Sequence, residues 1–238
     1  MASWAPSEIT KERMKQKTNN LINNFDEYIS RFDKAFVNEE TFGGPSIYFH
    51  FKCIKLFSDI PIFKKFEDDR FFEIIYAMLP SWGMHQRSSR VHDYHEFKRQ
   101  ILNQKENLLL LEDYKIWDIS SEDLLELHCS LDTILNIMSI TSAKAKLVAN
   151  TKVLHHILPN LIPPIDRRYT LGFFGLNDQL PNNYQAGAIF KVLFQYFVDI
   201  SKSITSEIQS KVSLVSENWH SSFTKVIDNA IIGSQNYY

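Results

Sequence analysis

Apolar residues recur every three or four positions along much of this chain, and this spacing constrains the fold more than any other feature. Over residues 9–36 the stripe comprises Leu21, Ile22, Phe25, Tyr28, Ile29, Phe32 and Phe36. Such a stripe is typical of an amphipathic helix that faces a core, and we expect one long helix there. Only seven glycines occur, and alternating runs of Val, Ile and Thr are few, which argues against a β-sandwich or barrel. The sequence therefore predicts an all-α fold.

Capping residues and prolines divide the rest of the chain into further helices. The expected helix starts are Ser46, Asp68, the region of Tyr94, Ser120 or Ser121, the residues after the polar hinge Thr141-Ser142, and the residues after Pro181. Pro80 and Pro159 are the expected stops of two of these helices. A last helix is expected over roughly residues 219–232.

The chain of 238 residues is long enough to bury a core. It carries no repeat, no low-complexity tract and no linker that would divide it. We therefore expect a single all-helical globular domain over residues 1–238, and two helical lobes with a cleft between them are one arrangement of it.

Charge and cysteine usage restrict the classes of partner. A net charge of −2 does not suit a general nucleic-acid coat, so any contact with DNA must use local patches. Cys53 and Cys129 have neither a disulfide framework nor metal-ligand spacing, which favours the reducing cytoplasm. The N-terminus lacks an apolar signal core, and no apolar run reaches about 18 residues. We expect a soluble cytoplasmic protein that does not enter a membrane.

Two adjacent histidines, His155 and His156, end the helix before Pro159. Adjacent helical positions diverge by about 100°, so the two side chains cannot bind one metal ion. We expect one histidine in the core and the other exposed. No P-loop and no dinucleotide-binding glycine motif occurs, and we expect neither a metal nor a cofactor.

The strongest candidate for a catalytic group is Asp166, in the segment Pro-Pro-Ile-Asp-Arg-Arg-Tyr that ends at Tyr169. Prolines fix φ and restrict the residue before them, so this connector is stiff. A carboxylate at the mouth of a cleft can orient water or stabilise a developing sugar cation. Arg167 and Arg168 can bind a phosphate or pair with the carboxylate. The alternative is that Asp166 caps the helix starting at Arg167, and both roles can hold at once.

Two further segments carry candidate ligand-binding side chains. The loop after Pro80 holds Trp82, His85 and Arg87, which suit a planar ring with a polar edge; a core tryptophan with a locally bonded histidine is the alternative.

The helix start at Gly43-Gly44-Pro45-Ser46 favours an anion or a polar ligand edge, although Ser46 can simply cap the helix. Tyr48 and His50 follow on different helix faces, so we expect at most one of them to line a pocket. Lys144, Lys146 and Lys152 on one helix, and Arg87 in the loop after Pro80, are candidate phosphate contacts, for which a solvated face is the alternative.

The order of elements around Asp166 resembles the end of the helix-hairpin-helix base-excision DNA glycosylases. In that family a hairpin and its second helix are followed by Val-Asp-Thr-His-Val, whose Asp is catalytic; here Ile165-Asp166-Arg167 occupies the place. The family hairpin Leu-Pro-Gly-Val-Gly corresponds to residues 142–146, which contain no glycine, so the lysines would replace its backbone phosphate contacts. The family's lyase lysine falls near Val148, which implies a monofunctional enzyme. Other segments resemble an uncharacterised microbial helical family.

The resemblance implies a DNA glycosylase-like hydrolase that flips a damaged or modified base out of the stack. Trp82 and Tyr48 would then wall the base, and His85 and His50 would read its polar edge. A modified base in phage DNA would suit such an enzyme. Two alternatives stay open: a non-enzymatic helical module that binds a nucleotide or a partner, and a hydrolase of small N-glycosides. The base and the oligomeric state are not predicted.

Overall fold

The computed structural model describes residues 4–37, 43–85, 89–176, 185–214 and 218–235. Within these ranges every regular element is a helix, and extended pairing is confined to one antiparallel bridge between Val91 and Thr141. The prediction of an all-α globular fold is confirmed. Arg87 and Pro181 lie outside the described residues.

The first half of the chain contains α1 (Glu8–Asn23), α2 (Phe25–Val37), α3 (Pro45–Phe57), α4 (Ile62–Lys65), α5 (Asp69–Ser81), α6 (Tyr94–Leu102) and α7 (Lys105–Leu109). The second half contains the 3₁₀ turn η2 (Ile116–Asp118), α8 (Ser121–Ile137), α9 (Leu147–Ile157), the π-helical turn η3 (Arg167–Leu171), α10 (Ala186–Ser203), α11 (Thr205–Lys211) and α12 (Phe223–Gly233).

Local capping chemistry sets several of these boundaries as predicted. The Asp68 carboxylate accepts a hydrogen bond from the Arg70 backbone N–H and caps α5. Ser120 and Asp123 form a reciprocal capping box at the start of α8, with both hydrogen bonds at 3.0 Å. These contacts satisfy amides that the helix itself leaves unpaired.

Two expected boundaries are wrong. The stripe over residues 9–36 is divided between α1 and α2, because Asn24 leaves the helical conformation and its side-chain amide donates to the Asn20 carbonyl at 2.8 Å. The start of α3 is capped by Gly44, and Pro45 is its first residue. The Ser46 hydroxyl instead donates to the Gly43 carbonyl at 2.9 Å.

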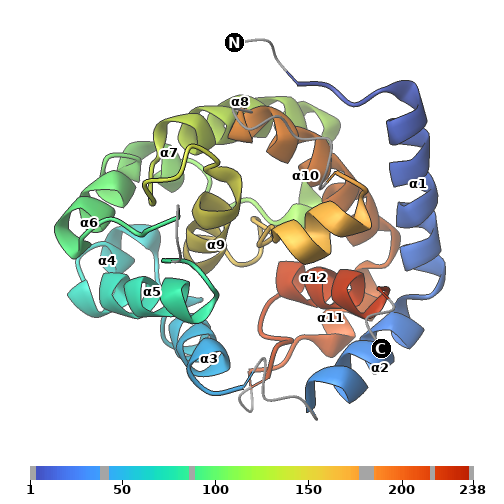
Figure 1. Ribbon diagram of the computed structural model, residues 1–238, viewed down its shortest axis with the longest axis horizontal. Helices are drawn as coiled ribbons and strands as arrows, with labels where there is room; N and C mark the ends of the chain where they lie inside the picture. Colours follow the sequence, from blue (N-terminus) through green and yellow to red (C-terminus); the bar gives the residue numbers. More distant parts are fainter. Residues whose placement is uncertain (1–3, 38–42, 86–88, 177–184, 215–217, 236–238) are drawn as a thin grey trace.

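The N-terminal helices α1 and α2 pack against C-terminal helices on one side of the molecule (Figure 1). Helix α12 packs most extensively against α2, and α10 packs against both α1 and α8. Two glycines allow these close approaches. A Cβ atom on Gly233 would lie 2.0 Å from the Tyr28 carbonyl oxygen, and one on Gly187 would lie 2.0 Å from an Asp132 carboxylate oxygen.

Helices α3, α5 and α9 form a second packed group, and α9 also contacts α8 and α10. Every residue from Asn150 to Ile157 is buried, so α9 is an interior helix rather than an amphipathic one. The segment that follows α9 leads to η3, which contacts α12. The candidate site lies where these two groups of helices meet. In the described ranges, no helix has the length and apolar character needed to cross a membrane.

Candidate functional site

The connector from α9 to η3 is held on both sides by buried groups. Its prolines, Pro159, Pro163 and Pro164, are all buried. The Thr224 hydroxyl of α12 donates to the Pro159 carbonyl at 2.8 Å, and the Ile165 N–H donates to the Thr151 hydroxyl of α9 at 3.2 Å. The connector is therefore anchored to two helices immediately before Asp166, which fixes the position of that residue.

Asp166 is both a helix cap and a member of a pocket. Its Oδ1 accepts hydrogen bonds from the backbone N–H groups of Arg168 at 2.8 Å and Tyr169 at 3.2 Å. Its Oδ2 lies 3.3 Å from the Lys152 ammonium. The side chain is 32% exposed, so the second oxygen can still accept a hydrogen bond from a water or a ligand.

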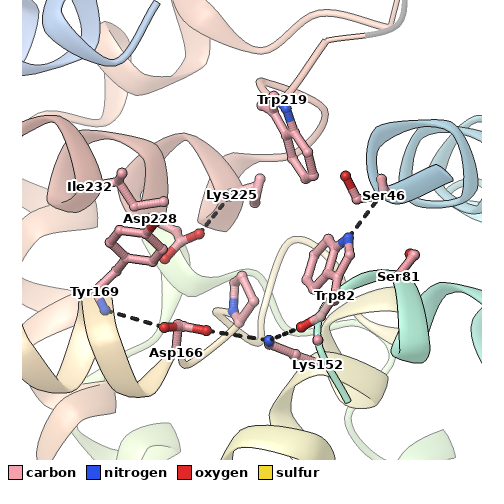
Figure 2. Close-up of a pocket in the computed structure, with 12 residues that line it drawn as sticks. Ser46, Ser81, Trp82, Lys152, Asp166, Tyr169, Trp219, Lys225, Asp228 and Ile232 are labelled. Carbon is pink, nitrogen blue, oxygen red and sulfur yellow. Dashed lines mark hydrogen bonds and ion pairs between the residues drawn. The ribbon is translucent and has the colours of Figure 1, made fainter. Parts of the chain in front are cut away.

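The pocket has a volume of about 270 Å³ and is formed by five segments. Ser46 comes from α3, Ser81 and Trp82 from the end of α5, Lys152 from α9, Asp166 and Tyr169 from the connector and η3, and Trp219, Lys225, Asp228 and Ile232 from the C-terminal region. Figure 2 shows these side chains around one space. The volume lies just below the usual range for ligand sites, about 300–1,000 Å³, and suits one small molecule or one nucleobase.

Two tryptophans give the pocket its aromatic wall. The Trp82 indole N–H donates to the Ser46 carbonyl at 3.1 Å, which fixes the ring relative to α3. The Trp82 and Trp219 ring centroids are 5.9 Å apart at 45°. Stacked aromatic rings lie about 4.5 Å or more apart, so a ring between these two would need a separation of roughly 9 Å. A planar ligand can therefore stack on one indole but cannot enter between them.

Two lysine–aspartate pairs meet in the pocket. The Lys152 ammonium contacts Asp166, donates to the Trp82 carbonyl at 3.2 Å and lies 5.5 Å from the Trp82 ring centroid. On α12 the Lys225 ammonium lies 2.6 Å from Asp228 Oδ2 and 5.1 Å from the Trp219 ring centroid. Burial raises the pKa of Asp228, and the nearby Asp166 carboxylate adds to that rise. The four charges balance, but they are held in a largely desolvated space where each interaction is strengthened.

Two buried histidines, His50 and His156, form a hydrogen-bonded network next to the aromatic wall. His156 Nδ1 donates to the Lys152 carbonyl at 2.7 Å, so its Nε2 is the acceptor for His50 Nδ1 at 2.9 Å. His50 Nε2 then accepts from the Ser221 hydroxyl at 2.6 Å. The His50 ring stacks on Trp219 with centroids 5.3 Å apart. The expectation that one of the two adjacent histidines is exposed is wrong, because α9 is buried on all sides.

The predicted base-binding residues are only partly brought together. Trp82 lines the pocket, whereas His50 is fully buried behind the wall and has both ring nitrogens bonded. Tyr48 is 43% exposed, on another face of α3, where its hydroxyl accepts from Lys52. His85 is exposed, with a φ of 68°, and is not among the residues that line the pocket.

The predicted DNA-binding cations differ in what they contact. The Lys146 ammonium donates to the Asn136 carbonyl at 2.9 Å, at the end of α8, so it stabilises a helix terminus. Lys144 and Arg167 are exposed. Arg168 is also exposed, and its guanidinium lies 5.4 Å from the Tyr169 ring centroid. The two arginines directly follow Asp166 in η3 and are therefore the cations best placed to approach a phosphate outside the pocket.

Four pocket residues were not predicted to line a ligand site: Lys152, which was considered only as a phosphate contact, Trp219, Lys225 and Asp228. A signal existed for the lysines and the aspartate, because each lies in a helix whose apolar residues occur on all sides. In α12, charges at positions 225 and 228 stand among Val226, Ile227, Ala230, Ile231 and Ile232. A charge in such a helix must be buried, and buried charges are paired. Trp219 precedes α12, and no local pattern distinguishes it.

The arrangement offers hydrogen-bond acceptors and cations but no metal site. Among the described residues, no group of three His, Cys, Asp or Glu side chains is placed to hold a metal ion. Comparisons of the chain with protein-family models, with curated proteins and with solved structures find no match.

Proposed function

We propose that the protein hydrolyses the N-glycosidic bond of a nucleoside whose base enters the pocket, and that this nucleoside is a modified or damaged one in DNA. The observation that carries the proposal is the Asp166 carboxylate, fixed by two backbone N–H groups and Lys152 at the edge of a base-sized pocket with an indole wall. The order of helices before Asp166, which resembles that of base-excision glycosylases, supports it as well.

The chemistry follows from the charge of Asp166. As the bond from sugar C1′ to the base nitrogen breaks, the base leaves with the electron pair and the sugar becomes cationic. A fixed carboxylate stabilises that cation, and its Oδ2 can orient a water for attack on C1′. The new C1′–O bond replaces the C1′–N bond, and the proton lost by water balances the one that the base gains. Trp82 provides the face on which the base stacks.

The proposed substrate, a nucleoside, has two candidate sources. Arg167 and Arg168 are exposed next to Asp166 and suit the phosphates that flank a flipped nucleotide. In contrast, the Lys146 ammonium is already bonded to the end of α8, and the segment before α9 lacks the glycines of the family hairpin. That second observation favours a free nucleoside or another small N-glycoside as the second candidate.

Product formation tests the proposal directly. Purified protein is incubated with duplexes that carry a panel of modified bases, and in parallel with the corresponding free nucleosides. Abasic sites are scored by alkaline strand cleavage, and released base is measured by chromatography. Product from duplexes identifies DNA as the source of the base, and product from nucleosides alone identifies the second candidate.

Variants separate catalysis from binding. Asp166→Asn keeps a helix-capping side chain but removes the charge, and we expect product formation to fall by about 10²-fold or more. Asp118, an exposed carboxylate remote from the pocket in sequence, provides the control variant Asp118→Asn, which should retain full activity. Full activity of Asp166→Asn would refute the mechanism. Binding of bases without product on any substrate would favour a binding module.

A further inference from the structure

One oxygen of a buried carboxylate in the pocket has no partner. Asp228 lines the pocket and its side chain is 7% exposed. Its Oδ2 is paired with the Lys225 ammonium at 2.6 Å, whereas Oδ1 is buried without a hydrogen-bond partner among the described residues. An unsatisfied buried oxygen costs free energy, and a charged one costs more than a neutral one. A ligand that donates a hydrogen bond to Oδ1 would recover that cost.

The neighbouring groups restrict what can approach Oδ1. The Lys225 ammonium already donates to Asp228 and, at 2.7 Å, to Asn229 Oδ1, and it also lies against the Trp219 ring. Two of its three N–H donors are therefore already used, which limits the hydrogen bonding it can offer to a carbonyl of the ligand. The Asp166 carboxylate lies near enough to raise the pKa of Asp228 further. In Figure 2, Asp228 and Trp82 lie on opposite sides of the pocket, so a base that fills the space between them would contact both.

We propose that Asp228 Oδ1 accepts a hydrogen bond from an exocyclic amino group of the bound base, so that the pocket selects amino-bearing bases over their carbonyl counterparts. Amino-bearing bases would then be the substrate class of the proposed glycosidase. The inference rests on the proposed function in one respect: a base must occupy the pocket. An amino group projects from the ring and presents N–H donors alone. A carbonyl at the same ring position would place an acceptor against the carboxylate, which repels it and leaves Oδ1 unsatisfied.

Two pairs of free bases test the inference without any turnover. Cytosine and uracil differ at one ring position by an amino group against a carbonyl, and so do adenine and hypoxanthine. Binding of each base to the wild-type protein is measured by titration calorimetry near neutral pH. We expect the amino-bearing member of at least one pair to bind about 10-fold or more tightly than its counterpart, as for a hydrogen bond to a charged group. Equal binding within both pairs, tighter binding of the carbonyl member, or no binding of any base would overturn the inference.

Substitution of the carboxylate gives a sharper test. In Asp228→Asn the oxygen can stay on Lys225 while the amide N–H₂ replaces Oδ1, so a donor now faces the base and the preference should reverse. Asp118→Asn changes an exposed carboxylate outside the pocket and should retain the wild-type preference. If Asp228→Asn does not fold, as judged by circular dichroism, Asp228→Ser is used, and the preference should disappear. A wild-type preference that survives loss of the Asp228 carboxylate would refute the inference.

The binding test of Asp228 and the hydrolysis test of the proposed function can succeed or fail separately. Selective binding that depends on Asp228, without hydrolysis of any substrate, would refute the glycosidase and leave the inference standing. Hydrolysis of amino-bearing and carbonyl substrates at equal rates, together with equal binding, would refute the inference and leave the glycosidase standing.

Discussion

Substituting His156 tests whether the buried histidines make the folded protein sensitive to mild acid. Burial lowers the pKa of His156 to about 4, and Lys225 and Lys152 nearby act in the same direction. Burial also lowers the pKa of His50 and His155 well below the usual value, and the neighbouring histidines and Lys225 add to that effect. The hydrogen bond from His50 to His156 requires a neutral His156 ring, because Nε2 of that ring is the acceptor.

The sign and size of the effect follow from proton linkage. An unfolded histidine takes up a proton below about pH 6.5, whereas folded His156 stays neutral until about pH 4. His156 therefore does not reduce the free energy of unfolding above pH 6.5. Below that pH the unfolded state gains protons that the folded state does not, so the free energy of unfolding falls as the pH is lowered towards 4. The fall is about 1.4 kcal/mol per pH unit, or roughly 3 kcal/mol over the whole window. Three such histidines would remove several kcal/mol near pH 5, a large part of a typical total of 5–15 kcal/mol.

Urea unfolding at about pH 7, 6 and 5 measures this dependence. We expect the free energy of unfolding to fall less steeply with decreasing pH in His156→Gln than in the wild type, by about 1.4 kcal/mol per pH unit. The control is His85→Gln, which removes an exposed histidine and should leave the slope unchanged. If His156→Gln and the wild type have the same slope, the buried histidine does not stay neutral in the folded state and the reasoning fails.

Three further predictions concern the packing and the pocket. Lys225→Met leaves the Asp228 charge unpaired and should destabilise the protein by about 3–5 kcal/mol, as measured by urea unfolding. Adding Asp228→Leu should restore most of the lost stability. A double variant as unstable as the single one would contradict this account. Gly233→Ala forces α12 away from the Tyr28 carbonyl and should lower the free energy of unfolding by about 1–3 kcal/mol. Thermal unfolding measures this, and an unchanged melting temperature would exclude the close contact. Trp82→Ala should weaken calorimetric binding of adenine about 10-fold or more through lost stacking, and unchanged affinity would show that the base does not stack there.

The parts of the fold that could be predicted from the sequence depend on neighbouring residues. Ser120 and Asp123 are three residues apart, and their side chains bond each other's backbone whatever the rest of the chain does. The same holds for Asp166 at the start of η3. The break at Asn24 was not predicted, because an apolar stripe continues across it and a polar residue at that position is equally compatible with a helix surface.

The helical character of the chain and the position of Asp166, between the end of one helical segment and the start of another, follow from the order of residues alone. What faces Asp166 depends on how distant helices pack. His50 forms hydrogen bonds with His156, 106 residues away in the sequence, and with Ser221, 171 residues away. Trp82 and Trp219 are also far apart in the sequence but lie in contact in the fold. Spacing of three or four residues carries no information about such contacts, because they arise only when α12 and α9 pack on opposite sides of the connector. The same packing places Lys225 and Asp228 in the pocket. Their candidate role follows from their burial there and not from their position in the sequence.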